Sequence, residues 1–477
     1  MKPAIFIKKL NDKGYSLLEA IIAITIFVIF MSAVLTLFLM SQESSSGSSL
    51  RQEANTIAHN SMEAVRSMRN LDFDSLIAGS HGLIFQNNRW FLDVDSPDEE
   101  NGFTRTVTIA YVDDDTKEID VNIVYGDPPR QKEVSLVQRL TRWQDIIAEN
   151  WYIGDWSNPI LVEEGNIGAG NYGTDIAAHK NTVYLTSIAD NDNNPDLHIF
   201  DVSNPSSPVL LSQLNVEQGL EAIWVKGGYA YVVERDSGDF FIIDVNNPSN
   251  PQVLSKLTLS PTKDGRSVFA LGQYAYVGGI EKEMYIINIT DPFEPYLFSV
   301  YERAQDDIMG INVLDGIAYL AQYDGKSLQI VDVSDPENPS KIKDVDPPGG
   351  SEKGMAVHAK SHDRVYVGRT NGGDHDEHQE FIVVDATNPN NPDIISLYDM
   401  PNTSIIDLHI ANDELAFLGT ASESMEFWVL DITDLDNIYR LGFYDLIAES
   451  TGIAYYRNYV YISVNHENAL QILTSSP

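Results

Sequence analysis

The sequence predicts a mostly β protein with three parts: an N-terminal membrane-spanning helix, a small antiparallel β domain and a seven-bladed β-propeller. Three observations support this prediction. An uncharged apolar run lies near the N-terminus, strand-like alternation follows it, and a strand-and-turn pattern recurs from residue 155 onward. The 477 residues exceed what one hydrophobic core organises, so several domains are expected.

The composition excludes several classes of protein. The chain has no cysteine, which excludes a disulfide scaffold and thiolate-ligated metal sites. Its net charge of −39 argues against nucleic acid as a partner, because phosphate binding requires a basic face. The N-terminus has the opposite charge, since Lys2, Lys8, Lys9 and Lys13 face only Asp12. Positive charge before an apolar segment keeps that end cytoplasmic, so the rest of the chain is expected to be exported.

The apolar run predicts a retained membrane helix with its membrane part at 17–40. The 21 residues from Ala20 to Met40 carry no formal charge. As a helix they span about 30 Å, the thickness of the hydrocarbon core of a bilayer. A cleaved secretory signal has a shorter apolar region and a small-residue cleavage site, which "LTLFLMSQESSS" supplies poorly.

The residues before this run carry a resemblance. "KG" followed by "YSLLEAIIAITIFVIF" resembles the class III leader of type IV pilins and of the pseudopilins of type II secretion. The resemblance implies a leader at 1–14, cleavage by a prepilin peptidase after Gly14, methylation of the new N-terminal Tyr15, and a filament-assembly role for Glu19. Phe or Met is commoner at the position of Tyr15. Thr36 replaces a proline frequent in major pilins, which favours a minor pilin or a pseudopilin.

Glu19 has a physical role in this interpretation. A carboxylate in hydrocarbon is costly and needs a partner. The free amine of Tyr15 on a neighbouring pilin supplies that partner in a filament, so the pair favours assembly. A plain signal-anchor with Glu19 at the membrane interface is the alternative.

Residues 15–70 are predicted as one pilin-like helix and 71–147 as a pilin-like β head. After the membrane part, apolar residues recur at helical spacing in "LRQEANTIAHNSMEAVRSMRN". The head then shows two short strands around Asn87 and Asn88, and three alternating segments, "FTRTVTIAYV", "EIDVNIVYG" and "KEVSLVQRLTRW". A helix followed by an antiparallel sheet is similar to the arrangement of pilin heads.

An octet repeats through residues 151–477. Its copies begin at Asp201, Asp244, Asn288, Asp332, Asp385 and Asp431, with separations of 43, 44, 44, 53 and 46 residues. Each follows a short apolar strand. The Asp or Asn is expected to bond its own backbone in a turn, and the proline ends the strand.

A second column repeats between the octets, with aromatic residues Tyr184, Tyr231, Tyr276, Tyr319, Tyr366, Phe417 and Tyr461. The ends of the domain are complementary. "DWSNPILVEE" at Asp155 begins like an octet without its strand, and "ALQIL" near Gln471 is a strand without its octet. The strand at 160–164 is therefore predicted to complete the last blade and close a ring of seven. The motif resembles the LVIVD repeat family of bacterial cell-surface proteins.

Two acidic loops are candidate metal sites. Calcium would suit Asp190, Asp192 and Asp196, and zinc would suit the loop with Asp374, His375, Asp376, Glu377 and His378. Neither has the spacing of a standard metal loop, so solvated acidic loops are favoured and no cofactor is expected. Calcium or zinc remains the alternative.

Charged residues near the starts of the expected innermost strands are candidates for binding at one mouth of the propeller channel: Asp175, Glu221, Arg266, Lys353 and Asp407. No catalytic motif is present, so no enzymatic activity is expected.

The sequence thus predicts a minor type IV pilin, or a pilin-like surface protein, that displays a propeller for adhesion or for recognition of an extracellular protein or glycan. It is expected in the inner membrane before assembly with other pilins, then on the pilus or cell surface. Two alternatives stay open: a pilin-anchored envelope enzyme acting at the channel mouth, and a type II secretion pseudopilin that binds cargo.

Overall fold

The computed structural model describes most of the chain beyond residue 48. The described residues are 30–32, 49–69, 73, 76–86, 89–93, 97–100, 102–113, 116–126, 128, 131–141, 154–189, 193–216, 219–259, 264–279, 283–304, 306–323, 326–347, 353–371, 379–422 and 424–476.

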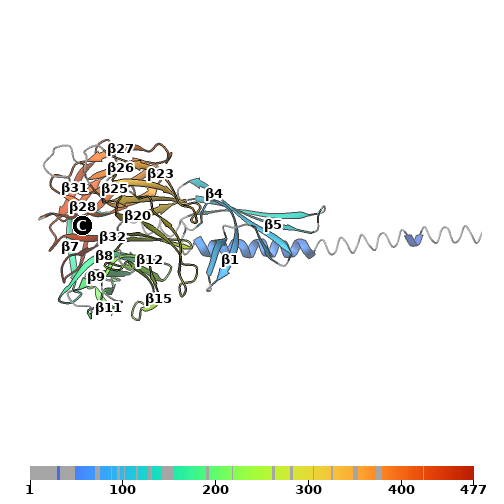
Figure 1. The fold of residues 1–477 in the computed structure, drawn as a ribbon, viewed down its shortest axis with the longest axis horizontal. Coiled ribbons are helices and arrows are strands. Elements are labelled where there is room, and N and C mark those ends of the chain that lie inside the picture. The colour runs from blue at the N-terminus through green and yellow to red at the C-terminus, as the bar shows by residue number, and fades with distance from the viewer. Residues whose placement is uncertain are drawn as a thin grey trace, which may run out of the picture.

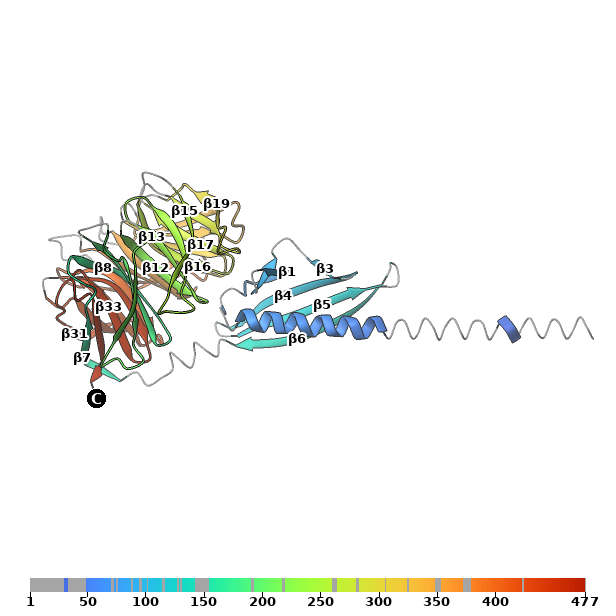
Figure 2. The ribbon, with the colours of Figure 1, turned by 90° about the horizontal axis from the view of Figure 1, so that it is seen from below.

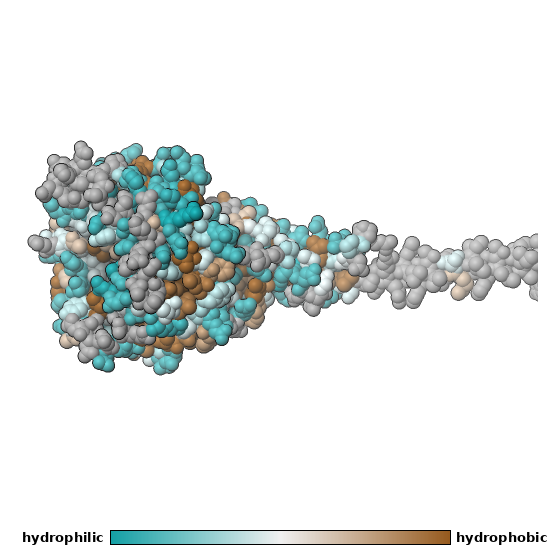
Figure 3. Space-filling view, in the orientation of Figure 1, coloured by the Kyte–Doolittle hydropathy of each residue, from teal (hydrophilic) through white to brown (hydrophobic). Residues whose placement is uncertain are grey.

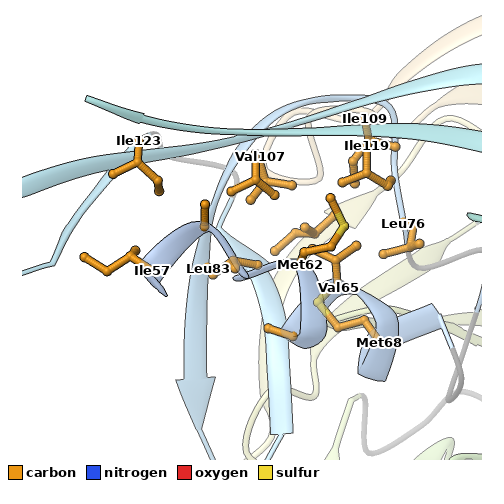
Figure 4. Packing of buried hydrophobic residues seen from close by; sticks show 14 of the residues in the cluster. Ile57, Met62, Val65, Met68, Leu76, Leu83, Val107, Ile109, Ile119 and Ile123 are labelled. Atoms are coloured by element: carbon orange, nitrogen blue, oxygen red, sulfur yellow. The ribbon is translucent and has the colours of Figure 1, made fainter. Parts of the chain in front are cut away.

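A helix at residues 49–69 carries the predicted amphipathic face. The apolar residues at three- and four-residue spacing are buried: Ile57, Ala58, Met62, Val65 and Met68. They form one cluster with sheet residues that include Val107, Ile109, Ile119 and Ile123, as Figure 4 shows. The predicted membrane part at 17–40 lies outside the described residues except for 30–32, which are helical. Within the described part of the chain, no helix combines the length and apolarity needed to cross a membrane.

The helix lies along one antiparallel sheet (Figure 2). The sheet order is β2-β1-β4-β5-β6, and β3 also pairs with β4. The bounds are β1 (Gly79–Gln86), β2 (Arg89–Asp93), β3 (Asp98–Glu100), β4 (Phe103–Asp113), β5 (Thr116–Tyr125) and β6 (Lys132–Thr141). Strand β5 alternates between buried and half-buried residues, because one face of the sheet covers the helix. The hairpin predicted around Asn87 and Asn88 is formed by β1 and β2.

From residue 155 onward, the described residues form seven four-stranded antiparallel sheets. The first three comprise β8 (Asn171–His179), β9 (Thr182–Ala189), β10 (Leu197–Asp201) and β11 (Val209–Leu214); β12 (Leu220–Lys226), β13 (Tyr229–Glu234), β14 (Asp239–Asp244) and β15 (Gln252–Thr258); and β16 (Gly265–Leu271), β17 (Tyr274–Gly279), β18 (Met284–Asn288) and β19 (Tyr296–Tyr301).

The next three sheets comprise β20 (Ile308–Leu314), β21 (Ile317–Gln322), β22 (Leu328–Asp332) and β23 (Ser340–Val345); β24 (Gly354–Ser361), β25 (Arg364–Arg369), β26 (Phe381–Asp385) and β27 (Asp393–Tyr398); and β28 (Ser404–Ala411), β29 (Leu415–Ala421), β30 (Phe427–Asp431) and β31 (Tyr439–Tyr444). The last sheet comprises β32 (Ser450–Tyr456), β33 (Tyr459–Val464), β34 (Leu470–Ser476) and β7 (Asp155–Gly165).

The sheets are arranged in a ring, as in a propeller (Figure 1). The first strand of each sheet contacts the first strand of the next, from β8 through β12, β16, β20, β24 and β28 to β32, and β32 contacts β8 again. Strand β7 pairs with β34, with Ile160 opposite Thr474 and Gly165 opposite Leu470. The predicted closure of the ring by residues 160–164 is therefore confirmed.

The octets form the turns expected of them. In every copy the side-chain oxygen of the first residue accepts a backbone N–H two residues later, at 2.8–3.0 Å. The incomplete octet at Asp155 makes the same bond to Ser157 at 2.9 Å. These turns stop each third strand and direct the chain to the rim of the ring.

Serine residues on the outermost strands join neighbouring sheets. Ser212 donates to the Pro248 carbonyl oxygen at 2.6 Å, Ser255 to that of Pro292 at 2.8 Å, and Ser396 to that of Leu435 at 2.6 Å. Each acceptor lies in the octet of the next sheet. The sequence analysis did not identify this column, although the serine repeats at the centre of the last strand.

Large apolar side chains on the outermost strands remain exposed: Val209, Leu210, Val253, Tyr296, Leu297, Ile395, Tyr439 and Phe443. In Figure 3, separate hydrophobic patches alternate with hydrophilic ones over the visible face. The rim therefore offers a mixed surface rather than one continuous apolar face.

Ring closure should be sensitive to one glycine. A Cβ on Gly442 would lie 2.1 Å from the carbonyl oxygen of Trp156, the residue that anchors β7. We expect Gly442→Ala to lower the free energy of unfolding by about 1–3 kcal/mol, because the closing strand must shift. Chemical denaturation of the full chain measures this. Gly279→Ala, whose nearest neighbour would lie at 3.3 Å, is the control, and an equal effect of both substitutions would contradict the prediction.

Candidate functional site: the central channel

Each innermost strand carries a β-bulge at the same level of the ring. The register shifts once early in every innermost strand, between the pairs Gly173/Asp175, Leu220/Ala222, Gly265/Ser267, Ile308/Gly310, Gly354/Ala356, Ile405/Asp407 and Ser450/Gly452. A bulge leaves one residue unpaired and redirects its side chain. The bulged residues are Thr174, Glu221, Arg266, Met309, Met355, Ile406 and Thr451.

These seven residues all line one cavity of about 990 Å³ along the channel. Its volume is at the upper end of the range for small-molecule sites. The bulges thus give the channel wall a layer of variable side chains, in which Glu221 and Arg266 are charged and the others are uncharged.

Four of the five predicted mouth residues line this cavity: Asp175, Glu221, Arg266 and Asp407. Lys353 is not among the lining residues. It precedes the first residue of β24, and its ammonium lies 3.8 Å from the centre of the Tyr323 ring. The structure therefore does not bring Lys353 into the group, and a binding role for the other four stays a prediction.

Glu221 forms the centre of an ion-pair cluster. Arg266 Nη1 lies 2.9 Å from Glu221 Oε1, and Arg235 Nε lies 3.7 Å from Glu221 Oε2. Arg266 also pairs with Asp264 at 3.0 Å. The cluster is partly exposed, so solvent screening keeps each pair weak, but it fixes the directions of the two guanidinium groups.

Asp175 and Asp407 join neighbouring innermost strands. Asp175 accepts the N–H of Ile176 at 2.7 Å and, from the next strand β12, the N–H of Ile223 at 2.9 Å. Asp407 makes the equivalent bonds at 2.8 Å to Leu408 and to Ile453 on β32. Both residues follow a bulge, where the disrupted ladder leaves these backbone donors available.

The surroundings of the two carboxyl groups shift their titration. Burial raises the pKa of Asp407 from 3.8 to about 6, although two backbone N–H groups oppose the shift. Burial and the negative charge of Asp407 raise the pKa of Asp175 well above its ordinary value. The two groups therefore interact electrostatically, and carboxyl groups with raised pKa values occur at functional sites as well as in structural networks.

Aromatic and imidazole rings line the channel beyond the carboxylates. The ring centres of His358 and His409 lie 5.3 Å apart, and that of Tyr455 lies 5.9 Å from His409. Burial lowers the pKa of His358 to about 3 and that of His409 to about 4. Both imidazoles are therefore neutral at physiological pH. Trp224 lines the same cavity and packs on Phe269 at 4.4 Å.

The head, the sheet of β1 to β6 with its helix, contacts the other end of the channel. The Arg89 guanidinium donates to the Gly227 carbonyl oxygen and lies 4.5 Å from the centre of the Tyr229 ring. Gln273 donates to the Leu92 carbonyl oxygen. Gly227 and Gln273 lie in turns after innermost strands, whereas Asp175 and Asp407 lie near strand starts. The predicted mouth residues therefore face away from the head.

The other predicted sites fall largely outside the described residues. This holds for Gly14, Tyr15 and Glu19, for Asp190 and Asp192, and for the loop with Asp374, His375, Asp376, Glu377 and His378. Asp196 is described: it is buried and accepts the Val216 N–H at 2.7 Å. The described part of the chain contains no group of three or more His, Asp or Glu side chains suited to a metal ion.

Asp196 belongs to a column that the sequence analysis missed. Glu380 accepts the Met400 N–H at 2.7 Å, and Glu426 accepts the Leu446 N–H at 2.8 Å. In each case an acid next to the third strand binds the backbone 20 residues later. The signal was present in the sequence as an acidic residue just before four of the third strands, at Asp196, Glu283, Glu380 and Glu426. Asp196 therefore has a structural partner, and its metal-binding role stays a prediction.

Comparisons with known proteins bear on both ends of the chain. The model of the prokaryotic N-terminal methylation motif matches residues 9–35, and the LVIVD repeat matches 172–216, 221–258, 263–302 and 307–346. The chain carries a prepilin-type leader and LVIVD repeats. Both resemblances seen in the sequence are confirmed. Neither family is a catalytic one. The methylation motif implies processing by a prepilin peptidase and assembly with other pilins.

No curated protein matches the chain. Among solved structures, a chain of the mitotic checkpoint complex is 9% identical, with a TM-score of 0.51 over 68% of this chain and 96% of that one. Sqt1 of Saccharomyces cerevisiae is 10% identical, with a TM-score of 0.47 over 66% of this chain and 83% of that one. At such low sequence identities, structural similarity bears on the fold alone. Of these two structures, only the chain of the mitotic checkpoint complex supports the propeller fold.

The half-buried carboxyl group of Asp407 should give a measurable pH dependence. Its folded-state pKa is raised, so its contribution to stability is present below about pH 4 and is lost as the pH rises through about 6. Between about pH 4 and pH 7, the free energy of unfolding of the wild type should fall by about 1–3 kcal/mol relative to that of Asp407→Asn. Denaturation series at several pH values measure the difference. The exposed Glu337→Gln is the control, and parallel curves for wild type and Asp407→Asn would contradict the prediction.

Proposed function

We propose that this chain is a minor pilin-like protein that displays a seven-bladed propeller on the pilus or cell surface for recognition of an extracellular protein or glycan. The observation that carries the proposal is the joint presence of the methylation motif at 9–35 and LVIVD repeats at 172–346 in one chain. The first inserts a protein into a filament, and the second builds a rigid domain on the part that projects from it.

The architecture supports this order of parts. A helix packs on the head sheet, and the ring of sheets contacts the head through Arg89 and Gln273. We take the leader as 1–14, the helix as 15–70, the head as 71–147 and the propeller as 151–477, with each four-stranded sheet as one blade. The propeller mouth that carries Asp175 and Asp407 then faces away from the helix and is open to a partner.

The size of the propeller favours the tip of a filament. A domain of about 320 residues on a pilin of about 130 would crowd a close-packed shaft, whereas a single copy at the end avoids the clash. Mixed surface character on the rim and a charged mouth suit a recognition domain.

Cleavage of the leader tests the proposal. We expect Gly14→Val to keep the 14 leader residues, because the peptidase needs the glycine before the cleaved bond. The mature mass should then be too high by these residues, and antibodies to the propeller should no longer label filaments. Mass spectrometry and immunogold labelling of intact cells measure both effects. Tyr15→Phe, which restores the commoner residue, is the control. A native chain that begins at Met1, or label spread evenly along the shaft, would contradict the proposal.

Assembly should depend on Glu19 separately from cleavage. Glu19→Val is expected to be processed normally but to enter filaments at least tenfold less, because the amine of a neighbouring Tyr15 loses its partner. Quantification of the protein in sheared filaments measures this. Glu43→Gln removes a carboxylate after the apolar run and serves as the control. Wild-type incorporation of Glu19→Val would refute the role given to this carboxylate.

A further inference from the structure

The carboxylates of Asp175 and Asp407 have no cationic partner among the described residues, although both line the cavity. Glu221, in the layer above, is neutralised by Arg266 and Arg235. Both residues are half-buried in the channel wall, and a carboxylate withdrawn from bulk water is normally paired with a cation or bound to a metal, because its lost hydration is otherwise uncompensated. The lack of a cationic partner for Asp175 and Asp407 therefore needs an explanation within the channel.

The two carboxylates flank the same segment of β32. Asp407 Oδ2 accepts the N–H of Ile453, and a Cβ on the preceding Gly452 would lie 2.7 Å from Asp175 Oδ1. Glycine is therefore required for the close approach of Asp175. Each carboxylate offers about four lone-pair positions, and the described backbone N–H groups occupy two of them. Acceptor capacity is left on both sides of Gly452.

The wall beyond the carboxylates suits the body of an organic cation. Trp224, His358, His409 and Tyr455 line the same cavity, and both imidazoles are neutral. Faces of aromatic rings attract a cation and also cover apolar carbon. The buried Nε1–H of Trp224 has no hydrogen-bond acceptor among the described residues.

Residues of the head line one end of the cavity: Arg69, Phe73, Arg89 and Thr141. Arg89 is fixed there by Gly227 and Tyr229. A ligand that enters at the opposite end passes the Glu221 cluster, reaches the carboxylates first and extends toward the rings.

We propose that the channel binds a small organic ammonium ion whose charged nitrogen lies between Asp175 and Asp407 and whose body contacts Trp224 and the two histidines. The inference rests on the proposed function only in taking the outward mouth as the recognition face. A metal ion fits less well: calcium needs six to eight oxygen ligands, and the described residues hold no group of three metal-binding side chains here. A cavity of about 990 Å³ also exceeds what an ion needs.

Protonation of the carboxylates competes with this ligand. The raised pKa of Asp407, about 6, means that protons fill the site in mild acid. An ammonium ion should therefore bind more tightly as the pH rises through 6. The raised pKa of Asp175 acts in the same direction, and burial keeps His358 and His409 neutral. The other charged or titratable groups that line the cavity or act on these histidines are Arg69, Arg89, His179, Lys180, Glu221, Lys226, Arg235, Arg266 and Lys360.

Calorimetry on the purified full chain in detergent tests the proposal, with n-butylammonium chloride as the probe. n-Butanol is the uncharged control, and calcium chloride and potassium chloride test inorganic cations. We expect the wild type to bind the amine but not the alcohol. Asp407→Asn and Asp175→Asn should each weaken binding at least tenfold, since the asparagine keeps one acceptor and loses the charge. The exposed Glu163→Gln, which removes the same charge from β7, should bind as the wild type does.

Three results would overturn the proposal: no binding of the amine at millimolar concentration, binding of the amine by both asparagine variants as tightly as by the wild type, or binding of calcium or potassium in place of the amine. Should the asparagine variants fail to fold, the pH series on the wild type decides. Affinity at least fivefold higher at about pH 7.5 than at about pH 5 supports the site, and equal affinity refutes it. Because calorimetry does not depend on filament assembly, its outcome is separate from that of the leader experiment.

Discussion

The pairing of β7 with β34 is the constraint on which the ring depends. These strands lie at opposite ends of the repeats, and Ser476 and Asp155, 321 residues apart, share a hydrogen bond. Trp156 anchors the closing strand: it is fully buried, lies 4.7 Å from the Phe417 ring and donates to Asn458 at 3.2 Å. Without this pairing, β34 would expose an open edge, and the sheet of β32, β33 and β34 would lack its outermost strand.

The ring is held together differently at its centre and at its rim. On the outside, the serine bonds from one sheet to the octet of the next recur with little variation. On the inside, the bulged side chains differ between most sheets, and the bonds between neighbouring innermost strands come from different residue types, among them Asp175, Arg266 and Asp407. Regular outer bonds thus leave the inner layer free to vary. This separation explains how a repetitive sequence produces one asymmetric, chemically distinct channel.

The sequence predicted the repeating strands, the octet turns and the closing strand, because each depends on local residue types: an apolar run, an Asx residue and a proline. It also identified Asp175, Glu221, Arg266 and Asp407 from their positions near strand starts. The bulges were not predicted, because the sequence analysis treated each innermost strand as regular. Lys353 was grouped with the others from its place just before the strand start, but the bulged residue of that strand is Met355. The contact between Arg89 and Gly227 depends on the placement of two domains, about which local patterns carry no information.

The closing pair also determines when the propeller is able to fold. Strand β7 precedes every other strand of the ring, and its partner β34 follows all of them. Because the chain is made from its N-terminus, β7 appears first and lacks its partner until the last repeat has been made. Completion of the ring is thus a late step in folding. During that interval the incomplete sheets have open edges, and the high negative charge of the chain provides electrostatic repulsion between copies.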